Sequence, residues 1–171
     1  MEEKNYKEKL KDITTFIFDV DGVFTNTQVF VNNDGDLLRS MNMKDGFALK
    51  TAVAKGYTIC IITGGGNVGV QKRFENLGVT DIYMLRHEKL ETFLEYQKSK
   101  GLKTEQILYM GDDIPDIPPM KHSGLATCPQ DAVPEVKAAA HYISHRDGGQ
   151  GAVRDVIEQV LKVRGDWFEF N

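Results

Sequence analysis

Acidic side chains follow two apolar segments of the chain in an arrangement that suits metal-assisted chemistry. Asp19 and Asp21 end one such segment, and Asp112, Asp113 and Asp116 follow another. Carboxylates held close together repel each other by roughly a few kcal/mol at an effective dielectric of about 20, so this cluster indicates a compensating cation. Oxygen ligands with few histidines nearby in the sequence favour Mg²⁺ over Zn²⁺.

Asp19 and Asp21 also suit two different chemical roles. Because the chain turns where the strand ends, one carboxylate can face a metal and an incoming phosphorus atom while the other lies above it. The pair would supply a nucleophile and a separate general acid and base. Thr63, followed by Gly64 at the end of another apolar segment, can donate a hydrogen bond to a phosphoryl oxygen. Lys89 is the best-placed lysine to neutralise the remaining charge.

Each of these motifs has a purely structural interpretation when taken alone. Asp19 and Asp21 could equally serve turn and cap chemistry, and helix capping is the simpler interpretation of the later aspartates. The four motifs together, in this order along the chain, are hard to obtain by chance. The sequence therefore favours a functional site.

The elements that must position these residues alternate between strands and helices. Strands are expected at 14–20, 57–63, 81–85, 106–111, 124–128 and 141–144, and helices at 44–55, 67–77, 87–100, 114–121, 133–139 and 152–163. A hairpin at 28–40 interrupts the pattern, with Asn33-Asp34-Gly35 as its turn. This alternation predicts an α/β, Rossmann-like doubly wound parallel sheet with helices on both faces. Ligands bind at the carboxyl ends of such strands, where the candidate residues would meet.

Length and composition limit the function classes. With 171 residues the chain is expected to form a single domain over 1–171. Its formal net charge of −4 disfavours a nucleic-acid binder. The sequence contains no apolar stretch long enough for a membrane span, and its charged N-terminus does not resemble a secretory signal. Cys60 and Cys128 are expected to be separate reduced thiols, and together these features predict a cytoplasmic protein.

The motifs resemble those of the haloacid dehalogenase superfamily of phosphatases. FDVDGVFT (18–25), IITG (61–64), Lys89 and YMGDDIPDIPPM (109–120) are similar to its four motifs in order. The hairpin with the following MKDGFALK, and the late GGQGAVRDV, resemble the small capless branch of that superfamily. This branch contains the phosphatases of 3-deoxy-D-manno-octulosonate 8-phosphate (KDO-8-phosphate) and of nine-carbon, sialic-type keto acid 9-phosphates.

The resemblance implies catalytic roles for the matched residues. Asp19 would be the nucleophile that forms an aspartyl-phosphate. Asp21 would protonate the leaving oxygen of the sugar and then deprotonate the water that hydrolyses the intermediate. Thr63, Gly64 and Lys89 would hold the phosphoryl group.

The resemblance also implies a metal site for Mg²⁺. Its ligands would be Asp19, the backbone carbonyl of Asp21, and Asp112. Asp113 and Asp116 would orient the site without binding the metal themselves. The cation and the lysine would offset the repulsion between a phosphomonoester and a carboxylate nucleophile.

The spacing between the motifs leaves no room for a cap domain. Forty-three residues separate Asp19 from Thr63, and 25 separate Thr63 from Lys89. The residues between Asp19 and Thr63 form the hairpin (about 27–41) and one helix. Those between Thr63 and Lys89 form a helix and a strand. The resemblance implies a homotetramer in which hairpins pack at the centre and neighbouring chains complete each site. The alternative is that the hairpin folds back on its own domain.

Weaker candidates concern substrate contacts. Asp45 would touch substrate or a neighbouring subunit, or would be a carboxylate at a helix N-terminus. The three glycines 64–66 remove a side chain where relatives often carry a charge, so Lys72 and Arg73 are candidates to bind a sugar carboxylate. Arg154 would contact substrate or anchor the chain end. The aromatic tail, about 165–171, would be a lid over a neighbouring site or an interface patch, and the four histidines are expected to be non-catalytic.

Together these features predict a Mg²⁺-dependent phosphatase that acts on a small sugar-acid phosphate. KDO-8-phosphate, on the path to lipopolysaccharide, is the expected substrate, and the alternative is a nine-carbon keto acid 9-phosphate. A further alternative is a non-catalytic tetramerisation domain like that of sialic-acid cytidylyltransferases. The presence of Asp19, Asp21 and Lys89 argues against it. A protein or nucleic-acid phosphatase is disfavoured by the net charge and by the branch motifs.

Overall fold

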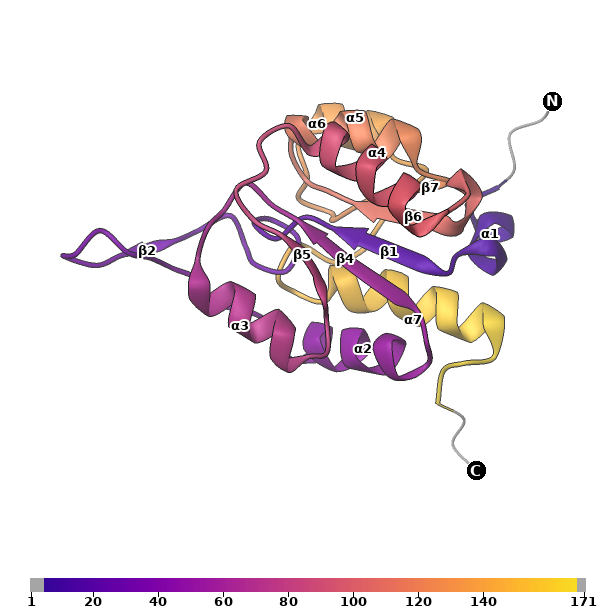
Figure 1. Cartoon of the computed structure of the whole chain (residues 1–171), viewed down its shortest axis with the longest axis horizontal. Helices are drawn as coiled ribbons and strands as arrows, with labels where there is room; N and C mark the ends of the chain where they lie inside the picture. Colours follow the sequence, from indigo (N-terminus) through magenta and orange to yellow (C-terminus); the bar gives the residue numbers. More distant parts are fainter. Residues whose placement is uncertain (1–4, 169–171) are drawn as a thin grey trace.

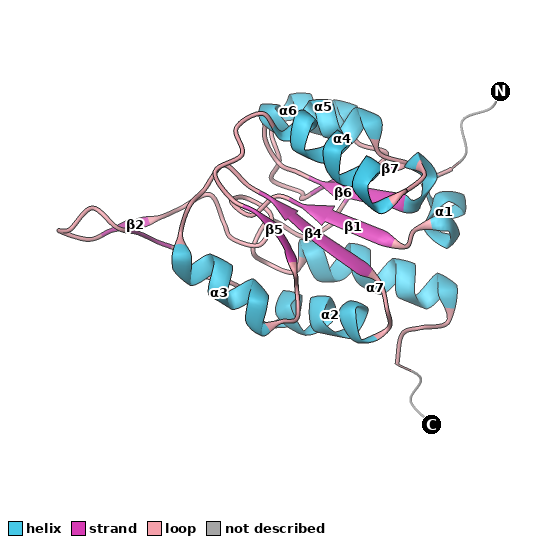
Figure 2. Ribbon diagram, viewed as in Figure 1, coloured by secondary structure: helices cyan, strands magenta, loops and turns pink. Residues whose placement is uncertain are grey.

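The computed structural model describes residues 5–168 and consists of a central sheet between two layers of helices (Figures 1 and 2). The six strands are β1 (Thr15–Phe18), β4 (Thr58–Ile62), β5 (Asp81–Tyr83), β6 (Ile107–Met110), β7 (Leu125–Cys128) and β8 (Tyr142–Ile143). They are all parallel and lie in the order β5-β4-β1-β6-β7-β8. This is the doubly wound topology that the sequence predicts. The strand order reverses at β1, where such sheets bind their ligands.

Helices from separate parts of the chain cover each face of the sheet. One face carries α2 (Met43–Ala54), α3 (Val68–Asn76) and α7 (Ala152–Arg164), and the other carries α4 (Lys89–Lys100), α5 (Ile117–His122) and α6 (Pro134–Ala139). The short α1 (Tyr6–Lys9) precedes β1, and single 3₁₀ turns lie at Leu10–Asp12, Thr104–Gln106 and Ile114–Asp116. Within the described residues, no helix is both long and apolar enough to cross a membrane.

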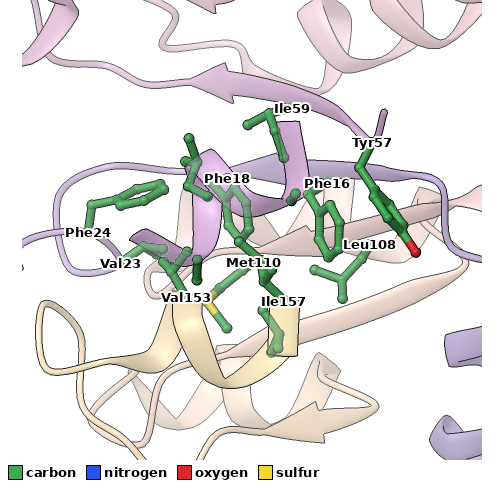
Figure 3. Close-up of a cluster of buried hydrophobic side chains, with 14 of the residues drawn as sticks. Phe16, Phe18, Val23, Phe24, Tyr57, Ile59, Leu108, Met110, Val153 and Ile157 are labelled. Carbon is green, nitrogen blue, oxygen red and sulfur yellow. The ribbon is translucent and has the colours of Figure 1, made fainter. Parts of the chain in front are cut away.

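Burial on both faces explains why the strands are continuously apolar. Phe16 and Phe18 point toward α7 and pack with Leu108 and Met110 against Ile157 (Figure 3). The intervening Ile17 belongs to the cluster under the opposite helices. A strand that alternates between two buried faces has no solvent side, so it needs no polar positions. After Thr15 at its start, the next polar side chain along β1 is Asp19, where the strand ends.

The hairpin projects from the body of the domain (Figure 1). Its strands β2 (Phe30–Val31) and β3 (Leu37–Leu38) pair antiparallel, and their turn includes Gly35 at φ +84°. Phe30 is 73% exposed and Val31 is 66% exposed. The alternative in which the hairpin folds back on its own domain is therefore wrong for this structure, and its apolar side chains face solvent.

Candidate active site

The predicted catalytic residues meet at the carboxyl edge of the sheet. Asp19 follows β1 and its N–H donates to the carbonyl of Met110 at 3.0 Å, which fixes it between β1 and β6. Thr63 follows β4, and its N–H donates to the backbone carbonyl of Tyr83 at 3.0 Å. A cavity of about 410 Å³ opens there. Its walls include the motif residues Asp19, Asp21, Thr63, Gly64, Lys89, Asp112 and Asp113.

Lys89 contacts Asp19 from the first turn of α4. Its Nζ lies 3.0 Å from Asp19 Oδ1 and 2.7 Å from Asp116 Oδ1. All three side chains are less than 10% exposed. Burial by itself would lower the pKa of Lys89, but the two carboxylates raise it above its ordinary value. The ammonium therefore remains charged and marks the wall where an anion would bind.

Asp116 uses both of its carboxylate oxygens on protein partners. Oδ1 accepts from Lys89 Nζ and from the hydroxyl of Tyr109 at 2.8 Å. Oδ2 accepts from the backbone N–H groups of Asp112 at 3.1 Å and Asp113 at 3.4 Å. A Cβ at Gly111 would overlap Asp116, so only glycine fits there. The four contacts hold the loop after β6 in place.

Asp112 is a buried carboxylate with an open ligand position. Its Oδ1 has no hydrogen-bond partner among the described residues, although its side chain is only 8% exposed. Burial, with the negative charges of Asp19 and Asp116, raises its pKa from 3.8 to about 8. Burial and Asp116 likewise raise the pKa of Asp19 to about 7, against the lowering effect of Lys89.

These carboxylates fit a divalent cation. Asp19, Asp112 and Asp116 each offer an oxygen within 4.8 Å of the others. Because Asp116 is fully hydrogen-bonded, Asp19 and Asp112 are the side chains free to bind the ion. Oxygen-only donors suit Mg²⁺, and a cation would remove the repulsion that raises both pKa values. A Cβ at Gly22 would overlap the Asp112 carboxylate, which explains the glycine after the second aspartate.

Asp21 faces the same cavity and is held by an arginine that the sequence analysis missed. Arg39, which follows β3, donates from Nε to Asp21 Oδ1 at 2.6 Å and from Nη2 to Oδ2 at 2.9 Å. Thr25 also donates to Oδ1, at 3.3 Å. The side chain of Arg39 is 10% exposed and that of Asp21 is 40% exposed. No spacing rule connects these residues, because they are 18 positions apart and belong to different elements.

The walls of the cavity include further residues that were not predicted. Arg86 and His87 line it, although the histidines were expected to be non-catalytic. A Cβ at Gly64 would lie 3.4 Å from His87 Nδ1, so the first of the three glycines leaves space beside the imidazole. Thr63 is buried, and its hydroxyl accepts the N–H of Gly65 at 3.1 Å, leaving its own O–H available as a donor to a ligand.

The structure does not bring the weaker candidates to this cavity. Asp45 is fully buried and accepts the N–H of Arg154 at 2.8 Å at the start of α7, and burial raises its pKa. Arg154 pairs with Glu158 and lies over the ring of Phe47. Arg154 lines a separate cavity of about 760 Å³, which contains none of the four motifs. This environment favours the structural interpretation of both residues.

Lys72 and Arg73 lie on α3. Lys72 is exposed and lines none of these cavities, whereas Arg73 lines a cavity of about 360 Å³ between α3 and the base of the hairpin. In the described part of the tail, Trp167 and Phe168 pack on Phe47. The end of the predicted tail lies outside the described residues.

Comparison with known proteins agrees with this geometry. A haloacid dehalogenase-like hydrolase family model matches residues 78–157. The 3-deoxy-D-manno-octulosonate 8-phosphate phosphatase of Salmonella typhi is 33% identical over 92% of this chain and 84% of its own length. The crystal structure of the Yersinia pestis phosphatase of that name has a TM-score of 0.92 and 31% identity, covering 95% of this chain and 88% of that one.

A second solved structure carries ligands. The Moraxella catarrhalis 3-deoxy-D-manno-octulosonate 8-phosphate phosphatase, in complex with a magnesium ion, a phosphate ion and KDO, has a TM-score of 0.91 and 30% identity. The match covers 94% of this chain and 92% of that one. The chain described above is therefore a phosphatase that belongs to the haloacid dehalogenase-like hydrolases, in the family of the 3-deoxy-D-manno-octulosonate 8-phosphate phosphatases.

Proposed function

We propose that this protein is a Mg²⁺-dependent phosphatase that hydrolyses KDO-8-phosphate to KDO and inorganic phosphate through an aspartyl-phosphate. The observation that carries the proposal is the position of Asp19. Its buried carboxylate lies in the wall of the cavity beside Lys89, with Thr63 and Asp21 on the same cavity. This arrangement supplies a nucleophile, an anion site and a second carboxylate for proton transfer.

In the first step, an oxygen of Asp19 attacks phosphorus while the bond from phosphorus to the sugar oxygen breaks. Asp21 gives its proton to that oxygen, and the sugar acid leaves as an alcohol. In the second step, Asp21 takes a proton from water, whose oxygen attacks phosphorus. The bond between phosphorus and Asp19 then breaks, which regenerates the Asp19 carboxylate and the protonated Asp21 and releases inorganic phosphate.

Three groups lower the charge barrier to this attack. Lys89 and the hydroxyl of Thr63 hold phosphoryl oxygens, and neither has to move far because both are buried. Mg²⁺, held by Asp19, Asp112 and the backbone carbonyl of Asp21, would supply Lewis-acid neutralisation of the phosphoryl charge. The magnesium and phosphate ions in the Moraxella catarrhalis structure support this assignment.

The substrate assignment rests on the relatives, whose names specify KDO-8-phosphate. The test is a panel of phosphorylated eight-carbon and nine-carbon keto acids, assayed for phosphate release with Mg²⁺. We expect the highest kcat/KM for KDO-8-phosphate, and no turnover by the Asp19→Asn variant, which keeps the size of the side chain. Turnover of none of the panel by the wild type, or full activity of the variant, would contradict the proposal.

We also propose that the working unit is a homotetramer, formed in the cytoplasm and serving lipopolysaccharide synthesis. The support is the hairpin, whose projecting strands expose Phe30, Val31 and Leu38 to solvent. Exposed apolar surface of this kind marks an interaction site. Light scattering should give about four times the chain mass of 19.2 kDa. A monomer mass under active conditions would refute this assembly.

A further inference from the structure

Arg39 connects the hairpin to the candidate acid and base. Its guanidinium donates to both oxygens of Asp21 and, from Nη1, to the carbonyl of Leu37 at 2.9 Å. These bonds use three of the five N–H groups of an arginine, so two remain. Because Nε and Nη2 already form the bidentate pair, the plane of the guanidinium is fixed relative to Asp21.

Arg39 lies between the active-site cavity and the space under the hairpin. Asp21, Thr63 and Gly65 line the active-site cavity, and the same three residues pack with Arg39 around a space too narrow for a water molecule. Arg39 also lines the cavity of about 360 Å³ between the hairpin base and α3. A ligand atom in the active-site cavity where a Cβ of Gly65 would lie comes within 3.8 Å of Arg39 Nη2.

Gly65 leaves space beside the ion pair of Asp21 and Arg39. A Cβ at that position would lie 3.6 Å from Asp21 Oδ2 and 3.8 Å from Arg39 Nη2, in van der Waals contact with the ion pair. Any longer side chain there would extend into the same space or displace the guanidinium. The glycine thus leaves room for part of a ligand beside Arg39.

A carboxylated substrate brings a second anionic group to the site, and the arginines near it are Arg86 in the cavity wall and Arg39 beside Asp21. The ammonium of Lys89 is already paired with Asp19 and Asp116 and would face the phosphoryl group. A sugar acid such as an octulosonate carries an additional negative charge on its leaving group. Arg39 is the cation bonded directly to Asp21, the residue that the mechanism places at the leaving oxygen.

We propose that Arg39 determines specificity for phosphomonoesters whose leaving group bears a carboxylate. Its two remaining N–H groups bind that carboxylate while its Nε edge keeps Asp21 in place. The assignment rests on the proposed function, because it uses Asp21 as the group at the leaving oxygen. The rigid fork of arginine suits this double role, whereas the single ammonium of lysine could hold only one of the two carboxylates well.

The test is a cycle that changes the protein and the substrate together. KDO-8-phosphate and its C1 carboxamide, which lacks only the negative charge, are assayed with wild type, Arg39→Ala and Arg39→Lys. Wild type should prefer the acid over the amide in kcat/KM by about tenfold to hundredfold, as expected for a charged hydrogen bond. In Arg39→Ala the ratio of kcat/KM for the acid to that for the amide should fall to near one, mainly because KM for the acid rises. In Arg39→Lys the ratio should be intermediate.

Controls separate this role from a structural one. The exposed Lys98→Ala change on α4 should leave the preference unchanged. Free KDO should inhibit wild type, and its inhibition constant should rise in Arg39→Ala by the same factor as KM. If Arg39→Ala lowers kcat/KM equally for both substrates and keeps the preference, Arg39 only positions Asp21 and the specificity assignment fails. If the wild type hydrolyses neither substrate, the proposed function fails instead.

Discussion

The raised pKa values of Asp19 and Asp112, the two carboxylates proposed to bind Mg²⁺, lead to a prediction about how the stability of the metal-free protein depends on pH. Burial and the charge of Asp116 raise the pKa of Asp19 to about 7, and burial with the charges of Asp19 and Asp116 raises that of Asp112 to about 8, from ordinary values of 3.8. In the unfolded chain both groups lose their protons near pH 4. Between about pH 4 and pH 8 the native state therefore binds more protons than the unfolded state, and its stability falls as the pH rises.

The magnitude follows from the same values. One pKa unit corresponds to about 1.4 kcal/mol, so raising the pKa of Asp112 from 3.8 to about 8 corresponds to a loss on the order of several kcal/mol above pH 8. The losses from Asp19 and Asp112 are not additive, because the charge of Asp19 is one of the causes that raise the pKa of Asp112. Mg²⁺ binding should remove most of it, and should release one to two protons near pH 7.

The assay is thermal or urea unfolding at pH 5 to 9, with Mg²⁺ and with a chelator. We expect the stabilisation by Mg²⁺ to grow with pH up to about 8 and then level off. The Asp112→Asn variant is the matched control, because it removes one charge while keeping the size of the side chain. It should be more stable than the wild type at pH 8 in chelator and gain little from Mg²⁺. A stabilisation by Mg²⁺ that is the same at pH 5 and pH 8 would refute the reasoning.

Three further substitutions test how the site is held together. Lys89→Met leaves two buried carboxylates without their ammonium partner. We therefore expect urea unfolding to show a loss of about 3–5 kcal/mol in unfolding free energy. Phosphate release should show at least a 100-fold loss in kcat. Tyr109→Phe removes one of four donors to Asp116 and should cost about 1 kcal/mol, measured by unfolding, with kcat changed less than tenfold. Gly22→Ala forces a methyl group onto the Asp112 carboxylate at a positive φ, and should weaken Mg²⁺ binding more than tenfold in calorimetry; unchanged affinity would contradict the packing described at this glycine.

The sequence was informative wherever a local pattern had a direct physical cause. Continuous apolar runs predict strands buried on both faces, and β1 with Phe16 and Ile17 in opposite clusters confirms this. Polar residues at strand ends then have to lie at one edge of the sheet, because all the strands are parallel. This is why Asp19, Thr63 and Asp112 could be placed together before any contact was known.

Contacts across the fold had no such local signal. Arg39 reaches Asp21 from the hairpin, and Asp45 meets the backbone of Arg154 from a position 109 residues away. Each contact depends on how a loop leaves its element, which no periodicity encodes. The hairpin could have packed on its own domain or projected from it, since its apolar residues fit either arrangement.

The sequence by itself thus determined which residues stand at the strand ends and what chemistry their types allow. Only the tertiary structure decided how those residues are ionised and oriented. The pKa values of Asp19 and Asp112 depend on burial and on the distance to Asp116, and the four bonds to Asp116 depend on the path of the loop after β6. Electrostatic energies fall with distance and rise with burial, and both quantities exist only once the chain has folded.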